Sequence, residues 1–343
     1  CFSADGWQTA HQGAPDRPER LRCWQSLVGR STHRPGLRCP NERGPYNFEL
    51  PGGYGGGLLT KGLTTDGKLN LPETRWAGIM RGLNTNDFEA ANIEFVEFWV
   101  LNPYMDKADD PGNVSKAGTM YIDLGTLSED IMRDSRQFFE NAIPTGQGTG
   151  TTASTPWGRV PVLPPVVNAF DNDPAKRVLQ DVGLDGLDDA GETQFFKDWV
   201  NSIQNSTLSN NAKQELLADP SNDNFVYFRD PSYDATQPGL LKRYRRFNNQ
   251  QGNSPVNNTS NLNPSATNLP DAEDLNRDNS LNESEAYFRY PINMPKTVED
   301  GQEVLDLESP LIKDLVTDTV VFRKDGVGPK YIWYRFKVPL DLK

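Results

Sequence analysis

One stretch of the sequence spaces oxygen-bearing side chains in the way that a calcium-binding loop does. In residues 274–285, counted from Asp274 as position 1, side-chain oxygens recur at positions 1, 3, 5, 9 and 12, which is the spacing of an EF-hand loop. Asn279 stands at position 6, where glycine is usual, and asparagine tolerates the left-handed conformation better than most residues. The backbone carbonyl at position 7 would complete the set. The pattern predicts a Ca²⁺ site with the ligands Asp274, Asn276, Asp278, Ser280, Asn282 and Glu285.

A second acidic segment, residues 181–192, follows the same spacing less closely. Gly186 occupies position 6, but Gly183 at position 3 supplies no side-chain ligand. The predicted ligands here are Asp181, Asp185, Asp189 and Glu192. For each segment the alternative is a solvated acidic turn, and a single site shared by both segments is a further alternative.

Most enzyme chemistries lack their usual residues in the body of the chain. Residues 41–343 contain neither cysteine nor histidine, which excludes cysteine nucleophiles, Ser-His-Asp triads and histidine-ligated metals there. Paired carboxylates could still hydrolyse a glycoside. Glu94 and Glu97, however, lie three apart on an expected strand and therefore point to opposite faces. We expect a protein that is not an enzyme.

Charge and hydropathy narrow the classes of partner. The net charge of -12 disfavours nucleic acid, whose phosphates would be repelled. The mean hydropathy is -0.67, and no apolar run is long enough for a transmembrane helix. Residues 1–40 differ from the rest, because they hold every cysteine and histidine and carry six arginines against three acidic residues. We interpret them as an unrelated or disordered leader.

Alternating apolar residues predict a mainly β fold with a few short helices. The expected strands are residues 92–101, which should pair with 118–125, and a hairpin of 319–323 with 331–338 around a turn at 325–328. The expected helices are residues 128–140, 195–204 and 212–218. A brief strand is expected at residues 225–228, and the basic run 240–246 should be a solvated or partner-facing strand.

These elements divide the sequence into six parts. After the leader, we expect a β-rich domain with one short helix (41–143), a Pro/Gly/Thr linker (144–180), a mixed segment with an acidic loop (181–247), a flexible Asn/Ser-rich linker (248–270), and an acidic loop with a β-hairpin (271–343). The aromatic residues Phe95, Phe98 and Trp99 could form a sugar-stacking platform, but packing in the core is the favoured interpretation.

Several segments resemble the SprA/Sov family. They occur in order along residues 41–343 and are ERGPYNF (42–48), RWAGIMR (75–81), NIEFVEFWVLNP (92–103), QFFEN (137–141), WGRVP (157–161), QDVGLDG (180–186) and EDLNRD (273–278). Residues 1–40 do not share the likeness. Members of this family are far longer, so the resemblance implies a fragment.

The resemblance implies a role in protein export. Proteins of this family form the outer-membrane translocon of the type IX secretion system in Bacteroidota, a giant transmembrane β-barrel that exports folded cargo and also supports gliding motility. They work with a PorV-type partner and a plug protein, and they offer no catalytic residues to carry over. Apart from the last expected hairpin, the strands here lack the alternation of a lipid-facing wall, so a soluble extracellular or periplasmic region is expected. Two rivals remain open: a secreted carbohydrate-binding β-sandwich module and a carboxylate-dependent glycoside hydrolase.

Overall fold

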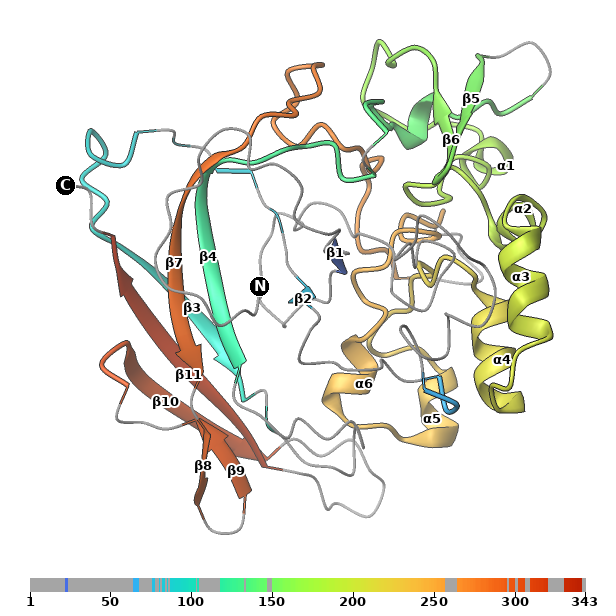
Figure 1. Cartoon of the computed structure of the whole chain (residues 1–343). Coiled ribbons are helices and arrows are strands. Elements are labelled where there is room, and N and C mark those ends of the chain that lie inside the picture. The colour runs from blue at the N-terminus through green and yellow to red at the C-terminus, as the bar shows by residue number, and fades with distance from the viewer. Residues whose placement is uncertain are drawn as a thin grey trace.

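The structure is a computed structural model of the whole chain. The residues that it describes are 22–23, 64–67, 76–77, 80, 82–83, 85, 87–102, 104, 118–132, 134–146, 150–256, 264–294, 296–299, 302–305, 309–319 and 330–340. Strands outnumber helices among them, so the mainly β fold is confirmed. Figure 1 shows the long strands on one side and the helices α2, α3 and α4 on the other.

Two antiparallel sheets enclose the largest apolar core. One sheet pairs β4 (Gly118–Thr126) with β7 (Ala286–Met294). The other has the order β10-β11-β3, formed by Ile312–Thr319, Lys330–Pro339 and Phe95–Leu101. Three two-stranded sheets accompany them: β1 (Arg22–Cys23) with β2 (Trp76–Ala77), β5 (Thr152–Thr155) with β6 (Gly158–Pro161), and β8 (Lys296–Glu299) with β9 (Gln302–Leu305).

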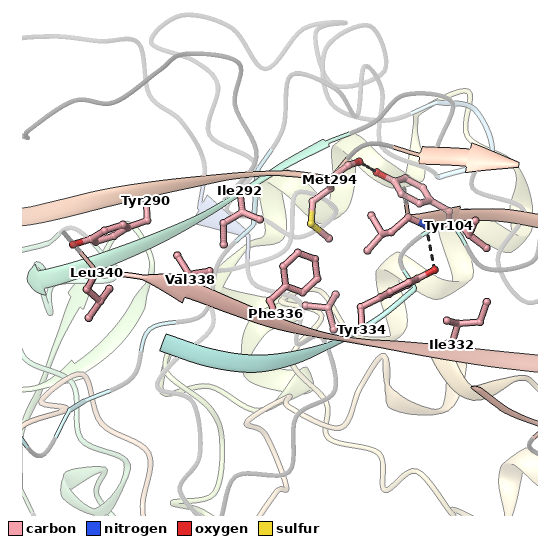
Figure 2. Close-up of a cluster of buried hydrophobic side chains, with 12 residues drawn as sticks. Tyr104, Tyr290, Ile292, Met294, Ile332, Tyr334, Phe336, Val338 and Leu340 are labelled. Carbon is pink, nitrogen blue, oxygen red and sulfur yellow. Dashed lines mark hydrogen bonds between the residues drawn. The ribbon is translucent and has the colours of Figure 1, made fainter. Parts of the chain in front are cut away.

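Alternate residues of β11 and β7 meet between the two larger sheets (Figure 2). Because successive side chains of a strand point to opposite faces, Ile332, Tyr334, Phe336 and Val338 all enter this core, as their alternation predicted. Two buried hydroxyl groups find partners within it. The Tyr104 hydroxyl donates to the Met294 carbonyl at 2.5 Å, and the Leu305 N–H donates to the Tyr334 hydroxyl at 3.2 Å.

The partners of the strands differ from those predicted. The expected pairing of residues 92–101 with 118–125 is wrong, because β3 pairs with β11 and β4 pairs with β7. Residues 312–319 pair with β11, where a strand at 319–323 was expected. Residues 320–323 and the predicted turn at 325–328 lie outside the described residues.

Six short helices occupy residues 174–244. They are α1 (Pro174–Arg177), α2 (Asp189–Phe195), α3 (Lys197–Gln204), α4 (Asn210–Ala218), α5 (Ser232–Thr236) and α6 (Leu240–Tyr244). Helices α3 and α4 confirm the helices predicted at 195–204 and 212–218. Trp199, Ile203 and Leu216 pack in a second apolar core that joins α3 to α4. Helix α6 covers most of the basic run 240–246, so the strand predicted for this run is wrong.

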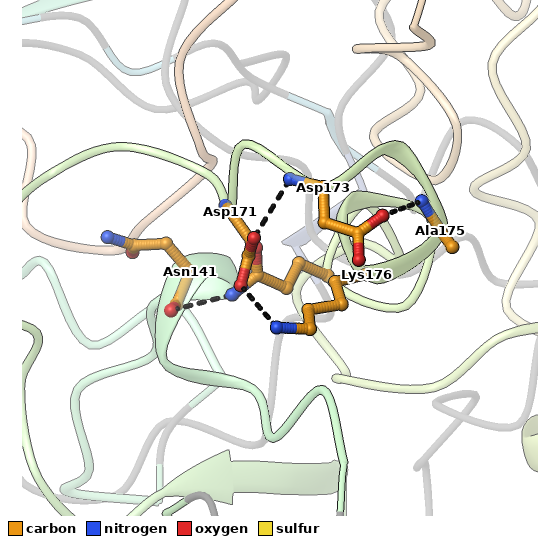
Figure 3. A network of polar contacts seen from close by, with 6 residues as sticks. Asn141, Asp171, Asp173, Ala175 and Lys176 are labelled. Carbon is orange, nitrogen blue, oxygen red and sulfur yellow. Dashed lines mark hydrogen bonds and ion pairs between the residues drawn. The ribbon is translucent and has the colours of Figure 1, made fainter.

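A polar network fixes the start of α1 (Figure 3). The Asp173 carboxylate caps the helix by accepting from the Ala175 N–H at 3.0 Å, and Asp171 accepts from the Asp173 N–H at 2.9 Å. Lys176 lies 3.6 Å from the Asp171 carboxylate. Gln180 connects this turn to the Asn141 carbonyl at 2.9 Å. The network thus positions the segment that leads into residues 181–192.

Carboxylates replace helical hydrogen bonds where a helix was predicted at residues 128–140. In the described part of that segment the chain is irregular, and only the 3₁₀ helix η3 (Glu140–Ala142) follows. The buried Glu273 carboxylate accepts from the N–H groups of Ile131, Met132 and Phe138, each at 3.0 Å. Ser135 has a φ of 54°, which a right-handed helix does not allow. The local signals favoured a helix, but distant acceptors satisfy its donors instead.

Both predicted linkers contain ordered structure. Residues 144–180 hold the hairpin of β5 and β6, whose Val160 is buried. In the Asn/Ser-rich segment 248–270, Asn249, Asn253 and Ser254 are buried, and residues 257–263 lie outside the described residues. Residues 225–228 form no strand and instead contribute to an aromatic cluster. The leader interpretation of residues 1–40 falls outside the described residues except for β1.

Candidate metal centre

Five carboxylates gather where the segment before α2 meets the segment after α4. They form two overlapping groups in which one oxygen of each residue lies within 4.8 Å of the others. One group is Asp185, Glu192 and Asp223, and the other is Asp189, Glu192 and Asp219. We call these five residues the carboxylate centre.

Helix α2 supplies two of the five. The Asp188 carboxylate begins the helix by accepting from the Gly191 N–H at 2.8 Å. Asp189 and Glu192 then follow three residues apart, a spacing that places both side chains on one face of the helix. The helix thereby directs two carboxylates to the same side.

A tight turn brings Asp185 to the same place. Gly186 has a φ of +67°, and a Cβ atom there would lie 2.2 Å from the Arg159 carbonyl oxygen, so this turn requires glycine. The Asp185 carboxylate accepts from the Leu187 N–H at 2.9 Å and from the Ser221 hydroxyl at 2.6 Å. The turn and its contacts fix the orientation of this carboxylate.

The segment after α4 supplies the remaining two. The Asp219 carboxylate accepts from the Asp223 N–H at 3.0 Å, and Asn222 between them adopts a φ of 53°. The Ser221 N–H donates to Glu192 Oε2 at 2.9 Å, and the Asn224 amide donates to Asp189 Oδ1 at 2.9 Å. These bonds join the segment to α2 on both sides of the centre.

The electrostatics disfavour five ionised carboxylates. Burial, followed by the nearby charge of Asp185, raises the pKa of Glu192 to about 10. Burial and the charges of Glu192 and Asp185 raise the pKa of Asp223 well above its usual range. Arg246 offsets part of this repulsion, because its guanidinium lies 3.5 Å from the Asp219 carboxylate. The group of Asp185, Glu192 and Asp223 does not contain Asp219, so its carboxylates repel one another more strongly than those of the other group.

Three oxygens of the centre are buried and accept no hydrogen bond from the described residues. They are Oε1 of Glu192, a residue that is 0% exposed, Oδ2 of Asp219 and Oδ1 of Asp223. A buried acceptor without a donor is costly, and such atoms in a native structure usually mark a water, an ion or a functional site. Oδ2 of Asp219 is the oxygen that lies 3.5 Å from the Arg246 guanidinium, whereas Glu192 and Asp223 belong to the group that also contains Asp185.

The structure brings together three of the four ligands predicted in residues 181–192. Asp185, Asp189 and Glu192 meet in the centre, whereas Asp181 contacts a different segment and accepts from the Ser254 N–H at 2.9 Å. Sequence reasoning missed Asp219 and Asp223. These two residues lie in the run Asp219-Pro220-Ser221-Asn222-Asp223-Asn224, whose composition is typical of a turn. The run lacks EF-hand spacing, so it did not predict a metal site.

The loop at residues 274–285 uses its oxygens differently. Its carboxylates belong to neither group that the described residues form. The Asp274 carboxylate accepts from the N–H groups of Asp278 and Asn279 at 3.2 and 2.8 Å, and Asp278 accepts from the Ser280 hydroxyl at 2.6 Å. The distant Glu129 accepts from the N–H groups of Leu275, Asn276 and Asn282. The Ca²⁺ site at this loop, with Asn276, Asn282 and Glu285 as further ligands, stays a prediction.

The composition of the carboxylate centre suits a hard cation. The oxygens that the centre offers are all carboxylate oxygens, the donors that Ca²⁺ and Mg²⁺ prefer. A glycosidase needs carboxyls that a sugar can reach on both sides, and the complete burial of Glu192 does not provide this. The arrangement therefore fits ion binding better than hydrolysis.

The aromatic residues of β3 divide between two faces. Phe98 lies in the core as predicted, but Phe95 and Trp99 are 38% and 41% exposed, so the expected burial of these two is wrong. The Lys337 ammonium lies 3.6 Å from the centre of the Phe95 ring. Clean alternation along Phe95–Leu101 explains this division, since Phe95 and Trp99 share the outward face.

Three further findings bear on the class of protein. In the described part of the chain, no helix is long and apolar enough to cross a membrane. A family model described as motility related/secretion protein, SprA_N, matches residues 198–343. A search among curated proteins gives no match. The matched span includes α3 to α6 and β7 to β11, and so covers part of both the helical region and the two larger sheets.

Proposed function

From the match over residues 198–343, which supports membership of the SprA family, we propose that this chain is a non-catalytic structural part of an outer-membrane protein-export channel. The family description gives a motility- or secretion-related role. Our proposal is narrower: the channel is the translocon of the type IX secretion system, and the same protein supports gliding motility. Its partners would be secreted cargo, a PorV-type outer-membrane protein and a plug protein. The parent protein would lie in the outer membrane, and this region would belong to its soluble extracellular or periplasmic part.

The family match carries this proposal, and the composition of the site supports it. Residues 41–343 lack histidine and cysteine, so general acid–base and nucleophilic chemistry would depend on carboxylates, lysines or hydroxyls alone. Three of the five residues of the carboxylate centre are buried, and Glu273, Glu140 and Glu129 all accept backbone N–H groups. Acidic residues in these positions hold segments together.

The experiment compares a core variant with two carboxylate variants in the intact parent protein of the native host. Phe336→Ala should destabilise the sheet pair, lower the amount of cargo in the culture medium and leave cargo in the periplasm. Glu94→Gln and Glu97→Gln should leave export and spreading on agar unchanged, since both side chains are exposed. Normal export by the Phe336→Ala protein, despite demonstrated loss of its fold, would contradict the proposal. So would glycan cleavage by the purified chain that either carboxylate variant abolishes.

One observation favours a second candidate, a carbohydrate-binding module. Phe95 and Trp99 are exposed on the same face of β3, as a row of sugar-stacking rings would be. The Lys337 ammonium already covers one face of the Phe95 ring, which leaves Trp99 as the main platform. Glycan binding by the purified chain that Trp99→Ala abolishes would favour this candidate.

A further inference from the structure

One group of three in the carboxylate centre does not contain Asp219, the residue that pairs with Arg246. Asp185, Glu192 and Asp223 place one oxygen each within 4.8 Å of the others. The neighbouring cation, Arg246, pairs with Asp219 in the other group, and the Asn224 amide binds Asp189. The second group is thus partly neutralised within the protein, whereas the first receives neutral N–H and O–H donors from Leu187 and Ser221.

This group contains two of the buried oxygens that accept no hydrogen bond from the described residues. Oε1 of Glu192 and Oδ1 of Asp223 are both buried and without a hydrogen bond, and Glu192 is completely buried. The Asp223 carboxylate lies against the backbone at Gly183, where a Cβ atom would be 2.2 Å from its Oδ2. Glycine at this position leaves the space that the carboxylate occupies. A bound cation would satisfy both free oxygens at once, because oxygen ligands surround Ca²⁺ at about 2.3–2.6 Å.

We propose that the carboxylates of Asp185, Glu192 and Asp223 bind one Ca²⁺ ion, which joins the segment before α2 to the segment after α4. The ligands are oxygens only, and Ca²⁺ accepts irregular sets of six to eight oxygens more readily than Mg²⁺, which demands octahedral geometry. The ion is structural. Helices α2, α3 and α4 have 7, 8 and 9 residues, and helices this short depend on tertiary contacts. The proposal does not depend on the export role.

A thermal-shift experiment on the full chain tests this. The protein is freed of metal with EDTA, dialysed, and melted with and without millimolar CaCl₂ at pH 7.5. Ca²⁺ should raise the melting temperature, since a ligand that binds only the folded state stabilises it. MgCl₂ at the same concentration should raise it less. Absence of a Ca²⁺-dependent shift, or an equal shift with Mg²⁺, would overturn the assignment.

Asp223→Asn is the discriminating variant. It keeps the shape of the side chain, and Oδ1 of the wild-type Asp223 accepts no hydrogen bond from the described residues that the change would break. Calorimetric affinity for Ca²⁺ should fall by about tenfold or more, because even outer partners of a metal site are worth about 10–100-fold. In EDTA the same variant should melt at a higher temperature than the wild type, since a neutral amide avoids the cost of either ionising or protonating Asp223 in the buried centre. A lower melting temperature in EDTA, with Ca²⁺ affinity retained, would overturn the proposal.

Asp278→Asn is the matched control. Asp278 is an exposed aspartate in the other acidic loop, and asparagine can still accept the hydrogen bonds from Ser280. The Ca²⁺-induced shift should survive in this variant. If Asp278→Asn removed the shift and Asp223→Asn kept it, the ion would belong to residues 274–285 and the proposed site would be wrong.

Discussion

The ring of Phe336 stacks on the ring of Phe98, with 5.4 Å between their centroids and 3° between their planes. Phe336 lies on β11 and Phe98 on β3, and these positions are directly paired in the sheet. Both side chains face the core between the two larger sheets, where Phe336 is 0% exposed. The pair therefore joins neighbouring strands that are remote in sequence, at the centre of the fold.

Phe336→Ala should lower the free energy of unfolding by about 3–5 kcal/mol, because it removes a buried ring and leaves a cavity. Urea denaturation followed by circular dichroism measures this. Trp99→Ala is the control on the same pair of strands, since Trp99 is 41% exposed on the opposite face. Its effect should be well under half as large. Equal destabilisation by the two changes would show that the core is placed wrongly.

Gly186→Ala should destabilise the chain by at least about 1–2 kcal/mol, the cost of a left-handed conformation for a residue with a Cβ atom. The added methyl group would also approach the Arg159 carbonyl to 2.2 Å. Gly146→Ala is the matched control, because a Cβ atom there meets nothing within 4 Å. Comparable melting temperatures for the two variants would contradict the turn described before α2.

Glu273→Gln should cost about 1–3 kcal/mol, the usual penalty for leaving a buried polar group unsatisfied. The Glu273 carboxyl group accepts from three N–H groups through its two oxygens. In glutamine an amide nitrogen replaces one of these oxygens, and this nitrogen cannot accept a hydrogen bond. Hydrogen exchange of the Ile131, Met132 and Phe138 amides would report the loss locally. Glu283→Gln, an exposed change ten positions away, should leave these amides protected.

The alternation of apolar residues predicted where strands lie but not which strands pair. Alternation predicted the strand at residues 331–338, and Ile332, Tyr334, Phe336 and Val338 share one of its faces because a strand has a fixed period of two. The partner of β4 is β7, which follows only after the whole helical region. Local sequence contains no information about such a distant pairing, and nearness in the chain favoured the wrong partner.

The candidate site shows the same division. Gly186 and the carboxylates of residues 181–192 were recognisable because EF-hand spacing is a local property of the sequence. Asp223 joins them through the fold, since α3 and α4 return the chain to the start of α2. The failed helix at residues 128–140 has a parallel cause: its donors bind Glu273, which lies far along the sequence. Tertiary contacts decided each outcome that local patterns missed.

The last prediction concerns pH. Burial raises the pKa of Glu273 from 4.5 to about 8, so between these values the folded chain keeps a proton that the unfolded chain releases. Protons bound by the folded state alone make the free energy of unfolding fall as pH rises, by up to about 1.4 kcal/mol per pH unit for one such group. The contribution of Glu273 is therefore complete below pH 4.5 and is lost as pH rises to about 8. Urea unfolding in EDTA from pH 5 to 8 should show a shallower decline for Glu273→Gln than for the wild type, because the amide does not titrate. Equal slopes for the two proteins would mean that Glu273 ionises normally in the folded chain.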